Sequence, residues 1–160
     1  MTLKLGEEYA LKLSKLASGS EEIAKKSVYA GAGIVADAVK KNLTALPEER
    51  FRRLGTRELF SGLPARQKRD LEESFGITPI QIGGDGYISA KVGFDGYGSN
   101  PTKKYPKGVP NQLLARAVES GSSVRQKTPF VRPAVTAVRK KAEAEMGRVV
   151  EEEIQKTMKE

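Results

Sequence analysis

Apolar residues recur every three or four positions along the first third of the chain, which is the spacing of one helical face. The recurring positions are Val28, Ala32, Val35, Val39, Leu43 and Leu46. Pro47 follows them and cannot continue a helix. The pattern predicts one long helix over residues 20–46, with Ser18 or Ser20 as its N-cap. Residues 1–19, with leucines among lysines, are expected to form a short amphipathic lead-in.

Two glycines inside this predicted helix match part of a dinucleotide-binding fingerprint, as Gly31-x-Gly33-x-x-Ala36. That fingerprint needs a buried strand ending at its first glycine, so that the N-terminus of a helix meets the pyrophosphate. The residues before Gly31 are instead charged and helical in their pattern. We therefore interpret both glycines as places where another element packs closely against the helix, and we expect no cofactor.

The predicted elements are shorter in the middle of the chain. Residues 64–75 predict a short helix with Pro64 in its first turn. Residues 77–94 hold two β-rich runs around a Gly-Gly-Asp-Gly cluster, which is typical of a hairpin. These elements predict an α+β fold in a single domain over residues 1–160. A long N-terminal helix and a C-terminal helix would pack on a small antiparallel β-sheet built around the hairpin.

The last third of the chain alternates loop and helix. Residues 95–110 are rich in glycine and proline and predict an extended loop or arm. Residues 111–119 fit a helix capped by Asn111, with a strand as the alternative, and we favour the helix. A charged helix is predicted over residues 133–158, with Pro133 in its first turn.

The chain contains no cysteine and no histidine. Disulfides, zinc sites built from these residues, and Ser-His-Asp or Cys-His catalytic arrangements are therefore excluded. The carboxylates Asp85 and Asp95 lie in glycine-rich turns, where aspartate is common for its backbone hydrogen bonding. We predict no catalytic site, no metal site and no enzymatic activity. No apolar run is long enough for a membrane helix, and Glu7 and Glu8 interrupt any signal peptide, so we expect a soluble protein made in the cytoplasm.

The formal net charge of +8 and the pI of about 9.7 raise the alternative of nucleic-acid binding. Its candidate residues are Arg50, Arg52, Arg53, Arg66, Lys68 and Arg69, with Lys103 and Lys104 as additions. A solvated loop and helix is the competing interpretation. We favour it, because nearby glutamates offset much of the charge.

Two prolines enclose Phe130 and Arg132 in the segment Lys127-Thr-Pro-Phe-Val-Arg-Pro133. An aromatic ring and a guanidinium held in a restricted geometry suit either an interface hot spot or a clasp inside the domain, and both alternatives stay open. The candidate interaction residues are Phe130, Arg132, Pro133, Glu119, Lys103, Lys104 and Tyr105.

Over residues 20–158 the sequence resembles the tailed-phage gene-product-ten family, whose namesake is the phage Hong Kong ninety-seven. The most specific matches are Glu119-Ser-Gly121, similar to the family's Glu-x-Gly turn, and Pro129-Phe-Val-Arg-Pro-Ala134, similar to its Pro-Phe-hydrophobic-Arg-Pro-Ala motif. The resemblance implies a non-enzymatic virion or prophage protein of the head–tail junction, made in the cytoplasm of the bacterial host. It also implies ring assembly, commonly as a hexamer, and contacts with other neck and tail proteins.

Overall fold

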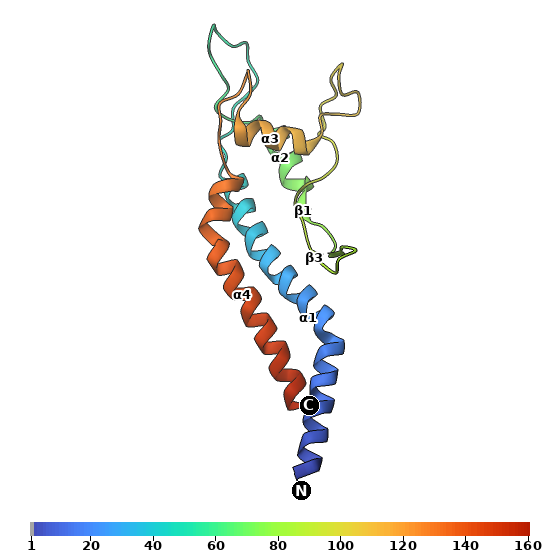
Figure 1. The fold of residues 1–160 in the computed structure, drawn as a ribbon. Helices are drawn as coiled ribbons and strands as arrows, with labels where there is room; N and C mark the ends of the chain where they lie inside the picture. Colours follow the sequence, from blue (N-terminus) through green and yellow to red (C-terminus); the bar gives the residue numbers. More distant parts are fainter. Residues whose placement is uncertain (1) are drawn as a thin grey trace. The chain divides into compact units, whose positions relative to one another are not determined.

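The computed structural model describes residues 2–160, and the side chains from residue 7 onward. Its elements follow in the order α1 (Thr2–Thr44), α2 (Ala65–Ser74), β1 (Phe75–Ile77), β2 (Gln81–Ile82), β3 (Ile88–Ser89), β4 (Val92–Phe94), α3 (Asn111–Ser120) and α4 (Val131–Lys159) (Figure 1). The fold is α+β, as the sequence predicts, with a long N-terminal helix, a C-terminal helix and short antiparallel strand pairs.

These elements divide into two compact units. Unit 1 consists of the chain up to Ile34 together with Pro79–Ala90 and Lys140–Glu160, and unit 2 consists of Val35–Thr78 and Lys91–Arg139. Helices α1 and α4 each contribute residues to both units. The single domain expected from the sequence stays a prediction.

Helix α1 begins well before the expected position. Residues 2–19 continue the helix, so the prediction of a separate lead-in and of an N-cap at Ser18 or Ser20 is wrong. Both hydroxyls donate hydrogen bonds to carbonyls three residues earlier, at 2.9 Å to Lys15 and 2.8 Å to Ala17. A serine that bonds back in this way is accommodated inside a helix, and the cap signal then has no effect. Met1 lies outside the described residues.

In unit 1, α1 and α4 lie side by side (Figure 1). A Cβ added at Gly31 would come within 2.6 Å of the sulfur of Met146, so the glycine permits a close approach of α4. Ser27 Oγ donates to the carbonyl of Met146 at 3.0 Å. The packing interpretation is therefore confirmed for Gly31. It is wrong for Gly33, because nothing lies within 4 Å of a Cβ at that position.

The hairpin forms as two short strand pairs. Strand β1 pairs with β4 in unit 2, and β2 pairs with β3 in unit 1, both antiparallel. The paired residues begin at Phe75, two positions before the predicted start. Thr78 interrupts the ladder: its N–H donates to the carbonyl of Lys91 at 2.8 Å, while its hydroxyl accepts from the N–H of Lys91.

Unit 2 contains the apolar core. The core residues are Val39, Leu43, Leu46, Leu63, Leu71, Ala115, Val118, Phe130 and Ala134. They come from α1, α2, α3, α4 and the segment after α1. The rings of Phe75 and Phe94 pack 5.2 Å apart across the strand pair, and Phe94 lies 6.0 Å from Phe130. The α1 members of this core, Val39 and Leu43, were part of the predicted apolar stripe, whereas Ala36, which is also buried, was not.

The helix predicted over 64–75 is present as α2, but Pro64 occupies its N-cap position instead of its first turn. Pro64 precedes α2 and Gly121 follows α3, where a φ of 80° suits glycine. The helix predicted over 111–119 is confirmed as α3. Its predicted cap is wrong, because Pro110 occupies the N-cap position and Asn111 is the first helical residue. The Asn111 amide instead donates to the carbonyl of Asp95 at 2.9 Å.

Candidate interaction surfaces

Glu119 caps the beginning of α4 from the end of α3. One carboxylate oxygen accepts the N–H groups of Phe130 at 2.7 Å and Val131 at 2.8 Å, and the other accepts that of Arg132 at 3.0 Å. These are N–H groups that the first turn of a helix leaves without intrahelical partners. Burial by itself would raise the pKa of Glu119. The three hydrogen bonds and the charge of Arg132 outweigh it, so the pKa lies below its ordinary value.

This cap explains the role of the motif residues. Phe130 is 1% exposed and belongs to the core of unit 2, so of the two alternatives left open for this ring the structure shows the internal clasp. The main-chain carbonyl of Phe130 also accepts a hydrogen bond from the side chain of Asn42 at 3.0 Å. Arg132 and Pro133 are exposed. The two most specific motifs of the sequence therefore meet at one internal junction, where Glu119 contacts residues 130–132.

The loop over residues 95–110 is closed at its base. Tyr97 and Pro110 form an antiparallel bridge, and the N–H of Gly98 donates to the carbonyl of Val109 at 2.8 Å. Ser99 donates to the carboxylate of Asp70 from both its N–H and its hydroxyl. The predicted segment is therefore a loop whose two ends are held together at its base within unit 2.

The tip of this loop presents lysines. Lys103, Lys104 and Lys107 are exposed, and Lys104 lies 5.5 Å from the ring centroid of Tyr105, which is half-buried. The N–H of Tyr105 donates to Thr102, and the N–H of Thr102 donates back to the carbonyl of Tyr105 at 2.9 Å. The tip thus has a defined backbone.

The second loop, residues 47–63, is organised by two carboxylates. Glu49 accepts hydrogen bonds from the N–H groups of Ser61 and Gly62 and from the hydroxyl of Ser61. Arg52 forms ion pairs with both Glu49 and Glu58. Arg52 and the N–H of Gly55 lower the pKa of Glu58 to about 2, so this carboxylate stays ionised under ordinary conditions.

The six candidate nucleic-acid residues therefore fall into two groups. Arg52 and Lys68 are engaged inside unit 2, since the Lys68 ammonium donates to the carbonyl of Leu46 at 3.0 Å and lies 3.8 Å from Glu48. The remaining four are exposed: Arg50, Arg53, Arg66 and Arg69.

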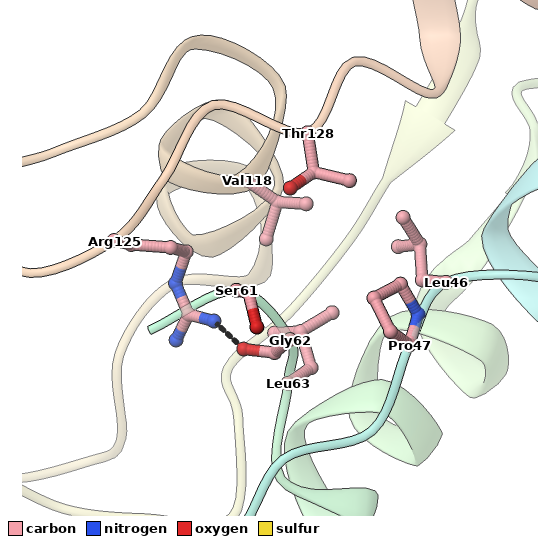
Figure 2. Close-up of a pocket in the computed structure, with 8 residues that line it drawn as sticks. All are labelled: Leu46, Pro47, Ser61, Gly62, Leu63, Val118, Arg125 and Thr128. Carbon is pink, nitrogen blue, oxygen red and sulfur yellow. Dashed lines mark hydrogen bonds between the residues drawn. The ribbon is translucent and has the colours of Figure 1, made fainter. Parts of the chain in front are cut away.

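Sequence reasoning missed Arg125, which is 7% exposed. Its guanidinium donates to the carbonyl of Gly62, as Figure 2 shows, and to the side chain of Gln67 at 3.1 Å. Burial lowers the pKa of this arginine. The cavity beside it is about 10 Å³, which is room for about one water molecule rather than for a substrate. Nothing in the sequence around Arg125 signals a buried arginine, because its partners lie about sixty residues earlier.

Unit 1 has an apolar surface. An open groove runs along α4, lined by Ser27, Met146, Gly147, Val150, Glu151, Ile154 and Gln155. On α1, Leu11 and Tyr29 are 58% and 57% exposed, and they lie 18 residues apart, which is five full helical turns and therefore the same face. Tyr9 and Leu13 are also exposed, as are Ile82 and Tyr87 near the hairpin turn.

The charges are divided unequally between the units. Unit 2 contains 18 basic and 9 acidic residues, whereas unit 1 contains 10 basic and 11 acidic residues. The whole net positive charge of the chain therefore belongs to unit 2, and unit 1 is close to neutral.

The described residues contain no cluster of three or more acidic side chains placed to hold a metal ion. Within the same residues, no helix combines the length and the apolar composition needed to cross a membrane. Comparisons with models of protein families, with curated proteins and with solved structures found no match to this chain. Membership of the gene-product-ten family therefore stays a prediction from the motifs.

Proposed function

We propose that this protein is a non-enzymatic assembly protein that associates with copies of itself through unit 1. The apolar surface of unit 1 is the observation that carries the proposal. Leu11 and Tyr29 form one exposed apolar face of α1, and the groove along α4 adds a second apolar strip. Exposed apolar surface of this kind marks an interaction site, because its burial by a partner lowers the free energy.

The charge distribution supports a second copy as that partner. Unit 1 is nearly neutral, and five of its basic side chains form ion pairs within it, such as Lys25 with Glu21 and Arg148 with Glu152. Two copies can therefore approach through unit 1 without strong repulsion. Strands β2 and β3 form a two-stranded pair, so each has an outer edge that a neighbouring strand can extend.

Within this class we propose the head–tail junction of a tailed phage, as a tail-completion, neck or tail-terminator protein of the virion. The support is the pair of motifs at Glu119-Ser-Gly121 and Pro129–Ala134. A closed ring forms when one patch of each copy contacts a different patch of the next copy and the rotation between copies returns to its starting point. The resemblance favours a ring of six copies. Other neck and tail proteins are its proposed partners. Phe130 has no part in the docking, since it is buried.

Light scattering coupled to gel filtration tests the self-association. The unit 1 variant replaces two exposed apolar side chains with serine, by Leu11→Ser and Tyr29→Ser. The unit 2 variant is the control and replaces two comparably exposed apolar side chains, by Leu113→Ser and Val124→Ser. We expect the wild-type protein and the unit 2 variant to form the same oligomer, and the unit 1 variant to shift towards the monomer. A wild-type protein that stays monomeric at high concentration would contradict the proposal.

Complementation tests the phage role. In a prophage carrying a disrupted copy of this gene, the head–tail proposal predicts filled heads and free tails that fail to join in electron micrographs. Supplying the wild-type protein restores joined particles. Normal joined virions without the protein would overturn the head–tail assignment, and the self-association would be judged separately by its own measurement.

A further inference from the structure

Two loops of unit 2, residues 47–63 and 95–110, present a group of exposed basic residues. Figure 1 shows that both loops extend beyond α3 at the same end of the unit. Their exposed basic residues are Arg50, Arg53, Arg57, Lys103, Lys104 and Lys107. None of these six forms an ion pair with another residue in the described part of the chain. They are therefore available to an anionic partner.

The three acidic residues of the first loop pair with other groups than Arg50, Arg53 and Arg57, and Glu48 lies 3.8 Å from Lys68. Glu49 and Glu58 both bind Arg52 and accept backbone N–H groups of their own loop. One arginine and two glutamates thus form an internal network. Arg50, Arg53 and Arg57 lie outside it.

Both loops hold their basic residues in defined positions. The first loop is fixed by the Arg52 network and by a bond from the N–H of Phe60 to the carbonyl of Val124 at 2.9 Å. The second is fixed by the hydrogen bonds between Thr102 and Tyr105. Arg57 has a φ of 65°, a conformation that costs an arginine conformational free energy and a glycine almost none. An ordered group of cations loses little conformational entropy when it binds an anion.

We propose that this basic end of unit 2 binds the phosphate backbone of duplex DNA without reading its sequence. Six cations on two separate loops match an extended polyanion better than a single phosphate group. Lysine and arginine contacts to phosphates supply affinity and position, but no base specificity. The inference is independent of the head–tail proposal, because it rests on unit 2 alone.

Two observations favour duplex DNA over other partners. A second copy of the chain is disfavoured, because unit 1 is close to neutral and unit 2 is itself strongly positive. Single-stranded DNA is usually held by free aromatic rings on which bases stack. Here the ring of Phe51 packs edge-on against Phe60 at 5.4 Å, and that of Tyr105 lies beneath Lys104. Both rings thus have a partner within the chain, although Phe51 is 57% exposed.

Fluorescence anisotropy with a labelled short duplex tests the proposal on the full-length protein. The logarithm of affinity should fall linearly with the logarithm of salt concentration between about 50 and about 200 mM, because phosphate contacts release counterions. The variant Arg53→Gln, Lys103→Gln, Lys104→Gln removes three proposed contacts. We expect the steepness of its salt dependence to fall by up to about 3, and its affinity at low salt to fall at least about tenfold.

A matched variant controls for the loss of overall charge. This control removes the same number of positive charges from exposed positions of unit 1, by the substitutions Lys15→Gln, Lys140→Gln and Lys159→Gln. It should bind the duplex with nearly the wild-type salt dependence. Circular dichroism of both variants checks that they fold, which is expected because all six substituted side chains are exposed.

Three results would overturn the proposal. One is the absence of duplex binding by the wild-type protein at low salt. Another is an equal loss in both variants, which would mean that net charge alone drives binding. A third is tighter binding to polyglutamate, or to vesicles of phosphatidylglycerol, than to the duplex, which would assign the surface to an acidic protein or a membrane instead.

Discussion

Unit 1 and unit 2 are stabilised in different ways. All but one of the buried apolar residues among the described positions belong to unit 2, and the exception is Ala142. Unit 1 is connected instead by contacts between α1 and α4, including the Lys26–Glu153 ion pair at 2.7 Å and the bond from Ser27 to Met146. Unit 2 therefore has the interior of a self-sufficient fold, whereas unit 1 leaves apolar surface that a partner can cover.

The same division holds for charge. In unit 1, acidic and basic residues alternate along the helices at spacings of three and four, so they neutralise one another. Between Lys91 and Arg139 in unit 2 there are nine basic residues and only two acidic ones, Asp95 and Glu119, and Glu119 is buried. The neutral unit suits association between like copies, and the basic unit suits an anionic partner.

The largest effect is expected from the core of unit 2. Phe130→Ala removes a fully buried ring, which should lower the free energy of unfolding by about 3–5 kcal/mol. Denaturant titration followed by circular dichroism measures the loss. Val124→Ala, at a position 53% exposed in the same unit, serves as the control and should change little. A loss for Phe130→Ala as small as that of the control would contradict the internal role of this ring.

A smaller effect is expected at the cap of α4. Glu119→Gln keeps the shape of the side chain but removes the charge that accepts three N–H groups, and should cost about 1–2 kcal/mol at neutral pH. The folded-state pKa of Glu119 is lowered, so its contribution is present above the ordinary value near 4.5 and is lost as the pH falls through the folded-state pKa.

The difference in unfolding free energy between wild type and Glu119→Gln should therefore shrink as the pH is lowered below about 4.5. Glu73→Gln, at an exposed position, is the control and should show no such convergence. A difference that stayed constant down to low pH would mean that the carboxylate charge is not what stabilises the cap.

In unit 1, effects of opposite sign are expected at two neighbouring glycines, and the smallest of all is expected at Gly33. Gly31→Val places atoms where Met146 lies and should cost about 1–3 kcal/mol. Gly33→Ala meets nothing within 4 Å and should stabilise by up to about 1 kcal/mol, because alanine favours a helix. Thermal unfolding of both variants measures the shifts. Equal shifts at the two positions would show that α4 does not approach α1 at Gly31.

Local patterns predicted much of the fold. The apolar stripe of α1 identified Val39, Leu43 and Leu46, which are all buried, and Pro64 and Gly121 marked the ends of short helices. The predicted start at Ser18 or Ser20 was wrong because these hydroxyls donate to carbonyls three residues earlier inside the helix, instead of accepting an N–H group as a cap does. Capping signals are local, and the continuation of a helix depends also on what packs against it.

The candidate interaction residues were harder to predict. Arg52 and Arg53 are adjacent in the sequence, yet Arg52 joins two glutamates and Arg53 is exposed. Phe130 was recognised as an anchor, but its partners Asn42 and Glu119 lie 88 and 11 residues away. Whether a side chain faces the core or a partner depends on such distant segments, which no local pattern contains.

By itself, the sequence determined the helical periodicity, the net charge and the lack of imidazole and thiol chemistry, because these follow from residue types and their spacing along the chain. Only the tertiary structure decided that the buried apolar core belongs to unit 2, and which of the charged side chains of that unit are paired and which are left exposed. It did so by pairing Glu49, Glu58 and Glu119 with groups elsewhere in unit 2. The physical reason is that a charge or a ring is removed from solvent only by groups that folding brings to it from other parts of the chain.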